Sequence, residues 1–188
     1  MKVCVFGASS DNIDASYFEA VEDLGRKLAK NNHTVVFGGG AHGLMGAVAR
    51  GAAENGGEII GIAPSFFDVR DILYKDSGEL IFTETMAERK KIMEDISDAF
   101  IAVPGGVGTF EEFFEVLTLK QLQRHNKPLV IFNVNHYYDK LEELLSEIVQ
   151  RGFMKQECKD VYKVCHSAEE LIAYIENYNE TIENVNKY

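Results

Sequence analysis

Short apolar stretches alternate with longer amphipathic segments along the whole sequence, and this alternation constrains the fold more than any other feature. The short stretches are apolar throughout, as strands buried on both faces are. Parallel strands need a long crossover, usually a helix, so the pattern predicts an open, doubly wound α/β parallel sheet with helices on both faces. The predicted strands are Lys2–Gly7, Thr34–Phe37, Glu58–Ile62, Leu80–Thr83, Ala99–Val103, Leu129–Phe132 and Val161–Val164.

The segments between these strands follow a helical period. Within Phe110–Arg124, the apolar residues Phe110, Phe113, Phe114 and Leu117 recur at the spacing of one helix face. The other predicted helices are Asp14–Lys30, Leu44–Glu54, Met86–Ile96, Tyr137–Gln150 and Ser167–Tyr178.

Length and composition favour one domain. The chain has 188 residues, of which 46% are hydrophobic, which is enough to bury a core without staples. We therefore expect residues 1–188 to form a single domain, with Ser65–Gly78 as a loop over one face and 180–188 as a frayed tail. No run of about 20 apolar residues occurs, so we expect no membrane span, and no secretory leader is predicted.

Charge and cysteine content limit the partners and the compartment. The 30 acidic residues outnumber the 19 basic ones, which gives a net charge of −11 and disfavours binding to nucleic acid or to an anionic membrane. A small phosphate ligand is still allowed. Cys4, Cys158 and Cys165 are odd in number and lack metal-ligand spacing, so we expect free thiols in the cytoplasm and no metal site.

Ligands of doubly wound folds bind where strands end, so the turns after the strands are the first candidates. The turn Gly38–Gly43 matches the G-x-G-x-x-G pattern. A dinucleotide site also needs an acidic residue after the next strand, and that strand ends in Ile62-Ala63-Pro64. NAD binding is therefore disfavoured. Two readings stay open: a tight turn that needs glycine, or a floor of backbone amides for a phosphate or base.

A second glycine-rich turn, Pro104–Thr109, lies between a predicted strand and a helix. It is not a Walker loop, but amides at a helix N-terminus suit a monophosphate. Glu112 follows and has two readings. With Thr109 as N-cap it completes a capping box, which the pattern alone favours. Alternatively its carboxylate points into the cleft beside a sugar, and Glu111 has a weaker claim to that role.

Basic residues stand at an unexpected place in the segment Thr85–Lys91. Thr85 and Glu88 form a predicted capping box, so Arg89, Lys90 and Lys91 fall in the first two turns of the helix. The helix dipole disfavours cations there by about 0.3–1 kcal/mol each. They are either a solvated basic edge or a site for an anionic ligand, to which the planar fork of arginine is suited.

Three of these segments together resemble one family. Pro104–Glu112 is similar to the PGGxGTxxE signature of the LOG ("lonely guy") family of cytokinin riboside 5′-monophosphate phosphoribohydrolases. Met86–Lys90 resembles its M-H-E-R-K element, and Gly38–Gly46 its GGGxxGLMG turn. The three occur in the family's order, and the likeness covers Lys2–Met154. Many relatives are labelled lysine decarboxylases, but nothing in this sequence supports a pyridoxal-phosphate site.

The resemblance implies a Rossmann-like homodimer that hydrolyses the N-glycosidic bond of an N6-modified AMP to the free base and ribose 5-phosphate, with no cofactor. It implies that Arg89 and Glu112 are the catalytic pair. The substrate-binding residues that it implies are Lys90, Gly105, Gly106, Val107, Gly108, Thr109, Phe110, Glu111, Thr118 and, in the predicted loop, Asp71. Ala87 stands where the family usually has histidine, so base preference is open to change.

The chemistry of these residue types fits such a reaction. Cleavage builds positive charge on the ribose, which the Glu112 carboxylate can stabilise while it activates water. Arg89 can donate hydrogen bonds to the departing purine, but a guanidinium is a poor proton source. Two alternatives stay open: a general AMP or nucleoside-monophosphate nucleosidase, and a carrier that binds nucleotides without cleaving them.

Overall fold

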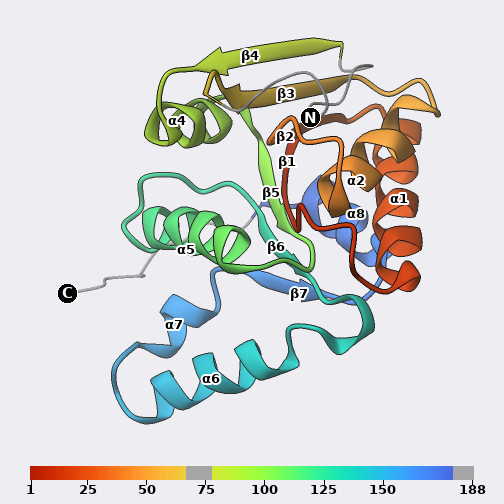
Figure 1. The fold of residues 1–188 in the computed structure, drawn as a ribbon. Coiled ribbons are helices and arrows are strands. Elements are labelled where there is room, and N and C mark those ends of the chain that lie inside the picture. Colours follow the sequence, from red (N-terminus) through yellow and green to blue (C-terminus); the bar gives the residue numbers. More distant parts are fainter. Residues whose placement is uncertain (67–77, 180–188) are drawn as a thin grey trace.

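The computed structural model describes residues 1–66 and 78–179. Its strands form one seven-stranded sheet in the order β4-β3-β2-β1-β5-β6-β7, and every adjacent pair is parallel. The predicted α/β doubly wound sheet is therefore confirmed (Figure 1). The strands are β1 Lys2–Phe6, β2 Thr34–Phe37, β3 Ile59–Pro64, β4 Glu79–Thr83, β5 Ala99–Ala102, β6 Leu129–Phe132 and β7 Lys163–Cys165.

Successive side chains of each central strand enter two different cores. In β1, Val3 and Val5 lie in the core on one face, and Cys4 and Phe6 lie in the core on the other. This arrangement explains the uninterrupted apolar stretches, because a strand covered on both faces has no position for a polar side chain.

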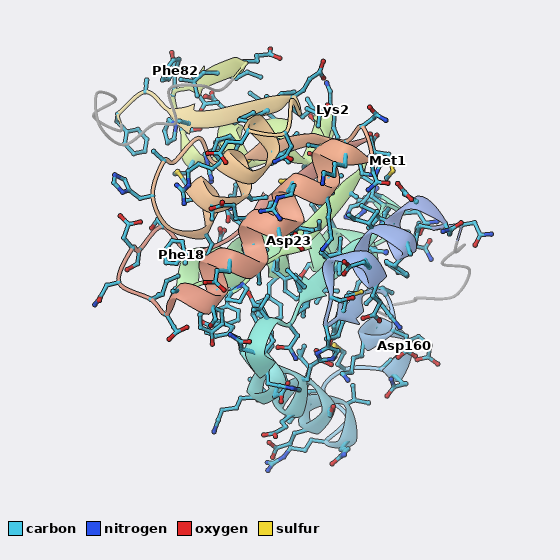
Figure 2. All side chains as sticks on the ribbon, turned by 90° about the vertical axis from the view of Figure 1, so that its right-hand side faces the viewer. Met1, Lys2, Phe18, Asp23, Phe82 and Asp160 are labelled. Carbon is cyan, nitrogen blue, oxygen red and sulfur yellow. The ribbon has the colours of Figure 1, made fainter. Side chains whose placement is uncertain are left out.

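Helices cover both faces of the sheet (Figure 1). The helices α1, α2 and α8 pack on one face, which Figure 2 views from the front with Phe18 and Asp23 marking α1. The helices α4, α5, α6 and α7 pack on the other face. Their bounds are α1 Ala15–Lys30, α2 Gly43–Ala53, α4 Met86–Ile96, α5 Val107–Gln121, α6 Asp139–Gln150, α7 Gln156–Lys159 and α8 Ala168–Glu176, with a short 3-10 turn, η1, at Val134–His136.

The order of the strands creates a crevice at the carboxyl ends of the central strands. From β1 the chain moves outward through β2, β3 and β4, and then returns to place β5 on the other side of β1. The connections after β1 and β5 therefore leave toward opposite faces, and the crevice opens between them. The two turns are joined directly, because the Ala8 N–H donates a hydrogen bond of 3.1 Å to the Pro104 carbonyl oxygen.

One predicted helix begins earlier than expected, with a consequence for the site. The helix α5 begins at Val107 with Gly106 as N-cap, and the Phe110 N–H already donates to the Gly106 carbonyl oxygen. The predicted capping box of Thr109 and Glu112 is therefore wrong, because both residues lie inside the helix. The box of Thr85 and Glu88 in α4 is confirmed.

Other differences are small. The last strand begins two residues later and ends one residue later than predicted, and the short α7 was not predicted. The three cysteines are buried free thiols, as expected. Most of the predicted loop Ser65–Gly78, including Asp71, and the tail 180–188 lie outside the described residues. Within the described part of the chain, no helix is both long and apolar enough to span a membrane.

Candidate active site

A cleft of about 660 Å³ lies at the carboxyl ends of β1, β2 and β5. Its walls come from the turns after these three strands and from the first turns of α2, α4 and α5. The lining residues are Gly7, Ala8, Ser9, Gly38, Gly40, His42, Met45, Met86, Arg89, Gly106, Val107, Gly108, Thr109 and Glu112.

Arg89 is buried in the wall of this cleft, with 5% of its surface exposed. Its Nε donates to the Ile62 carbonyl oxygen at 3.1 Å, and its Nη1 donates to Glu112 Oε1 at 2.7 Å. A Cβ atom on Gly38 would lie only 2.3 Å from Nη2. The glycine at this position of the Gly38–Gly43 turn thus makes room for the guanidinium.

Glu112 extends from α5 to meet Arg89, and its side chain is 11% exposed. Burial raises the pKa of this carboxyl, while the charge of Arg89 and the hydrogen bond from it act in the opposite direction. The neighbouring Glu111 carboxylate raises the pKa further. A carboxylate whose pKa is raised in this way accepts a proton more readily than an exposed one does.

The N-terminus of α5 forms the opposite part of the cleft. A Cβ on Gly105 would meet Thr109 Oγ1 at 2.0 Å, so the packing of the loop itself requires glycine there. A Cβ on Gly106 or on Gly108 would meet nothing within 4 Å. Glycine at these two positions leaves open space over the first amides of a helix, where an anion binds well.

The structure brings together part of the predicted site. Arg89, Glu112 and the stretch Gly106–Thr109 all line the cleft. The remaining predicted residues do not: Gly105, Lys90, Phe110, Glu111 and Thr118. Asp71 lies outside the described residues.

Two of these residues have partners that do not line the cleft. Lys90 forms ion pairs with Glu111 and, at 2.9 Å, with Glu115, so it ties α4 to α5. Phe110 packs edge-on against the Tyr138 ring, with 5.8 Å between the ring centres. Neither contact involves a residue that lines the cleft.

Sequence reasoning missed several lining residues. It gave His42 and Met45 no role in the site, and it did not place Met86 there. His42 Nδ1 lies 2.6 Å from Asp11 Oδ2, and the Gly43 N–H donates to the same carboxylate at 2.7 Å. The sequence marks Gly38–Gly43 as a turn after a strand, but it does not indicate that Asp11, from another turn, reaches it.

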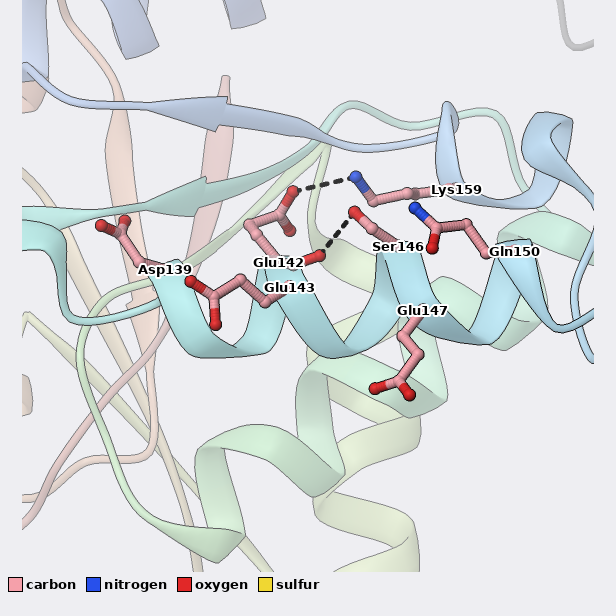
Figure 3. A pocket seen from close by; sticks show the side chains of 7 residues that line it. All are labelled: Asp139, Glu142, Glu143, Ser146, Glu147, Gln150 and Lys159. Atoms are coloured by element: carbon pink, nitrogen blue, oxygen red, sulfur yellow. Dashed lines mark hydrogen bonds and ion pairs between the residues drawn. The ribbon is translucent and has the colours of Figure 1, made fainter.

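A separate hollow of about 740 Å³ lies along α6 and shares no residue with the cleft (Figure 3). Its lining residues are Asp139, Glu142, Glu143, Ser146, Glu147, Gln150 and Lys159. Lys159 Nζ lies 3.3 Å from Glu142 Oε2. Among the described residues, no group of three or more His, Cys, Asp or Glu side chains is arranged to hold a metal ion. We assign this hollow no role in catalysis.

The cleft thus combines a buried ion pair with an open helix N-terminus. The first can stabilise developing positive charge and take up a proton, and the second can hold a phosphate. Both lie within one cavity, as a reaction on a phosphorylated ligand requires.

The chain is similar in sequence to a described protein family and to curated proteins. A family model described as "possible lysine decarboxylase" matches residues 45–175. The cytokinin riboside 5′-monophosphate phosphoribohydrolase LOG3 of Arabidopsis thaliana is 38% identical over 177 residues, which is 94% of this chain and 82% of that protein. LOG4 of the same organism is 38% identical over 184 residues, 98% of this chain and 86% of that protein.

Solved structures show the same fold. The molybdenum cofactor binding protein of Rippkaea orientalis superposes with a TM-score of 0.71 at 23% identity, over 93% of this chain and 94% of that chain. At this identity the likeness shows the fold alone.

Proposed function

Because this chain belongs to the family of LOG cytokinin riboside 5′-monophosphate phosphoribohydrolases, we propose that it hydrolyses the N-glycosidic bond of N6-substituted adenosine 5′-monophosphate to the free base and ribose 5-phosphate. The observation that carries the proposal is the buried ion pair of Arg89 and Glu112 in the wall of the cleft. A protein that only binds a nucleotide has no need of a carboxylate beside the sugar.

The reaction assigns a separate task to each member of the pair. The bond between C1′ and the purine N9 breaks, N9 keeps the electron pair, and positive charge builds on the ribose. A water oxygen bonds to C1′, and one of its protons passes to Glu112, whose raised pKa suits a proton acceptor. The departing base takes up a proton from solvent to become the neutral free base, and Glu112 returns its proton to solvent. Arg89 donates hydrogen bonds to the departing purine and stabilises the negative charge that develops there.

The substrate's phosphate is assigned to the N-terminus of α5. The open space over Gly106 and Gly108 supports this placement, and Val107 and Thr109 lie in the same turn. Lys90 and Glu111 then support the site indirectly, because their ion pair fixes α4 to α5. Roles for Gly105, Phe110, Thr118 and Asp71 in binding rest on the family resemblance.

We also infer a single cytoplasmic domain that forms a homodimer. The buried free thiols support a reducing compartment. The dimer rests on the family resemblance, and light scattering of the purified protein tests it.

The experiment compares two substrates. Purified protein is incubated with isopentenyl-AMP or with AMP, and free base and ribose 5-phosphate are followed by chromatography. We expect cleavage of isopentenyl-AMP well above that of AMP. Equal cleavage of both would indicate a general nucleotide nucleosidase instead. Binding of either compound by calorimetry without any cleavage would overturn the proposal in favour of a carrier.

A further inference from the structure

Three successive carbonyl groups before α5 are each bound by a different donor. The Val103 oxygen accepts from the Tyr138 hydroxyl at 2.7 Å, and the Gly105 oxygen accepts from the Tyr137 hydroxyl at 2.6 Å. The Pro104 oxygen between them accepts from the Ala8 N–H. The two tyrosines follow β6, so they reach this loop from the neighbouring strand of the sheet.

The bond from Tyr137 fixes the direction of an amide as well as a carbonyl. A peptide group is planar and trans, so its C=O and N–H point in opposite directions. With the Gly105 oxygen held by Tyr137, the Gly106 N–H points to the opposite side of the loop, and Gly106 lines the cleft. A flip of this peptide would turn a carbonyl oxygen toward the bound phosphate and repel it.

Glycine on both sides makes such a flip easy. Gly105 and Gly106 tolerate either orientation of the peptide between them, because neither has a Cβ to restrict the backbone. The two glycines that leave room for a ligand therefore do not fix the orientation of the peptide between them. A contact from another part of the chain has to fix it.

We propose that Tyr137 is a positioning residue that holds the Gly105–Gly106 peptide with its N–H toward the substrate's phosphate. This inference rests on the proposed function, which places the phosphate at this helix N-terminus. The Tyr137 ring is itself held edge-on by Tyr17 and by Tyr138, with ring centres 6.1 Å and 4.9 Å away.

Tyr138 provides a matched control within the same loop contacts. Its hydroxyl donates an equivalent hydrogen bond to the Val103 carbonyl oxygen. That carbonyl belongs to the peptide between Val103 and Pro104, and proline has no N–H to present. Tyr138 is also 2% exposed, whereas Tyr137 is 41% exposed. We therefore expect Tyr138 to matter mainly for stability and Tyr137 mainly for binding.

The test compares Tyr137→Phe with Tyr138→Phe. Calorimetry measures the Kd for ribose 5-phosphate, and kinetics give KM and kcat for isopentenyl-AMP. We expect Tyr137→Phe to raise both the Kd for ribose 5-phosphate and the KM for isopentenyl-AMP by about tenfold. We expect a smaller change in kcat and a Tm near that of the wild type. We expect Tyr138→Phe to lower Tm and to change Kd less. Equal Kd for Tyr137→Phe and the wild type, or an equal loss in both variants, would overturn the inference.

A second variant separates peptide direction from a general loss of structure. Gly106 has φ of −90°, and flipping the peptide before it would carry φ into the left-handed region, which alanine avoids. Gly106→Ala should therefore hold the peptide by itself. Because its methyl enters the open space over the helix N-terminus, the affinity of Gly106→Ala alone is the baseline, and adding Tyr137→Phe to it should lower affinity by a much smaller factor than Tyr137→Phe does in the wild type. Equal costs in both backgrounds would contradict the inference.

The two proposals fail in distinguishable ways. If the wild type neither binds ribose 5-phosphate nor cleaves isopentenyl-AMP, the proposed function fails. If the wild type does both and Tyr137→Phe behaves like it, only the role of Tyr137 fails.

Discussion

Two opposite charges lie in the cleft wall at a depth where neither is stable alone. Burial of an isolated charge is very costly, and the cost is offset only by a partner at short distance. Arg89 and Glu112 are such partners, at 2.7 Å, and both line the cleft. A substrate that enters therefore meets both charges in a fixed arrangement.

Gly38 sets the position of Arg89, and this gives a prediction. The Cβ of Gly38→Ala would lie 2.3 Å from Arg89 Nη2, so the guanidinium has to move. We expect kcat/KM to fall by about 100-fold, the order of loss for a displacement near 1 Å. Steady-state kinetics with isopentenyl-AMP provide the measurement.

The Arg89→Ala background is the control for that prediction. If Gly38 acts through Arg89, Gly38→Ala should cost little further activity once Arg89 is gone. The same 100-fold loss in both backgrounds would show that Gly38 acts in another way.

Among single residues, the sequence predicts more anion-binding candidates than the structure places in the cleft. The argument from the helix dipole applies equally to three consecutive cations, Arg89, Lys90 and Lys91. In the structure Lys91 pairs with Asp95 on the surface, Lys90 pairs with Glu111, and Arg89 alone of the three lines the cleft. Which side of α4 faces the cleft depends on how the helix packs, and the local pattern does not contain that information.

Among the elements, α5 shows why a local signal misled. Thr109 and Glu112 have the spacing of a capping box, and Gly-Val-Gly before them contains poor helix formers. The helix nevertheless begins at Val107, because contacts from the turn after β1 and from the segment after β6 hold the preceding carbonyls. Tertiary contacts thus determine the start of α5, and this start frees Glu112 to pair with Arg89.

Arg89 also joins three elements, so its removal should lower the stability of the folded protein. It links α4 to β3 through the Ile62 oxygen and to α5 through Glu112. We expect Arg89→Ala to lower the free energy of unfolding by roughly 3–5 kcal/mol at neutral pH, because Glu112 is left buried and unpaired. Urea unfolding measures this loss.

The loss should depend on pH in a definite direction. Removing Arg89 removes an influence that lowers the Glu112 pKa, so the carboxyl takes up a proton more readily as pH falls. Neutral Glu112 needs no partner, and the deficit of Arg89→Ala relative to the wild type should shrink at acidic pH. A deficit that stays constant from neutral to acidic pH would contradict this account.

For the molecule as a whole, the sequence predicts the class of fold but not the order of the strands in the sheet. Alternating apolar strands and helices indicate a parallel, two-faced sheet, and the structure confirms it. The return of the chain from β4 to place β5 beside β1 leaves no local signature, since Ala99–Ala102 is as apolar as any other strand. That return creates the crevice and brings α4 and α5 to the same site. The family resemblance predicts that Arg89 and Glu112 act together, and the structure places the two side chains in contact in the cleft wall.

The stability of the whole domain should fall in mild acid because of His125. Its Nε2 lies 3.0 Å from the Val116 carbonyl oxygen, and the Lys127 N–H donates to its Nδ1, so the ring is held neutral. Burial lowers its pKa below the ordinary 6.5. The unfolded chain therefore takes up a proton first, and stability present above pH 6.5 declines as pH falls from there toward the folded pKa.

Urea unfolding over this pH range checks the prediction. His125→Asn should be less stable than the wild type at about pH 7.5, and its stability should change less between about pH 6.5 and 5.5. His166→Gln is the matched control, since that side chain is exposed. An unchanged pH profile in His125→Asn would contradict the assignment.

The central claim is that Glu112 carries the cleavage of the glycosidic bond in this cleft. The most direct measurement is the release of ribose 5-phosphate from isopentenyl-AMP by the wild type and by Glu112→Gln, with Tm recorded for both. The account predicts equimolar base and ribose 5-phosphate from the wild type, and a rate about 100- to 10,000-fold lower from a folded Glu112→Gln. Release at the wild-type rate by Glu112→Gln would contradict it.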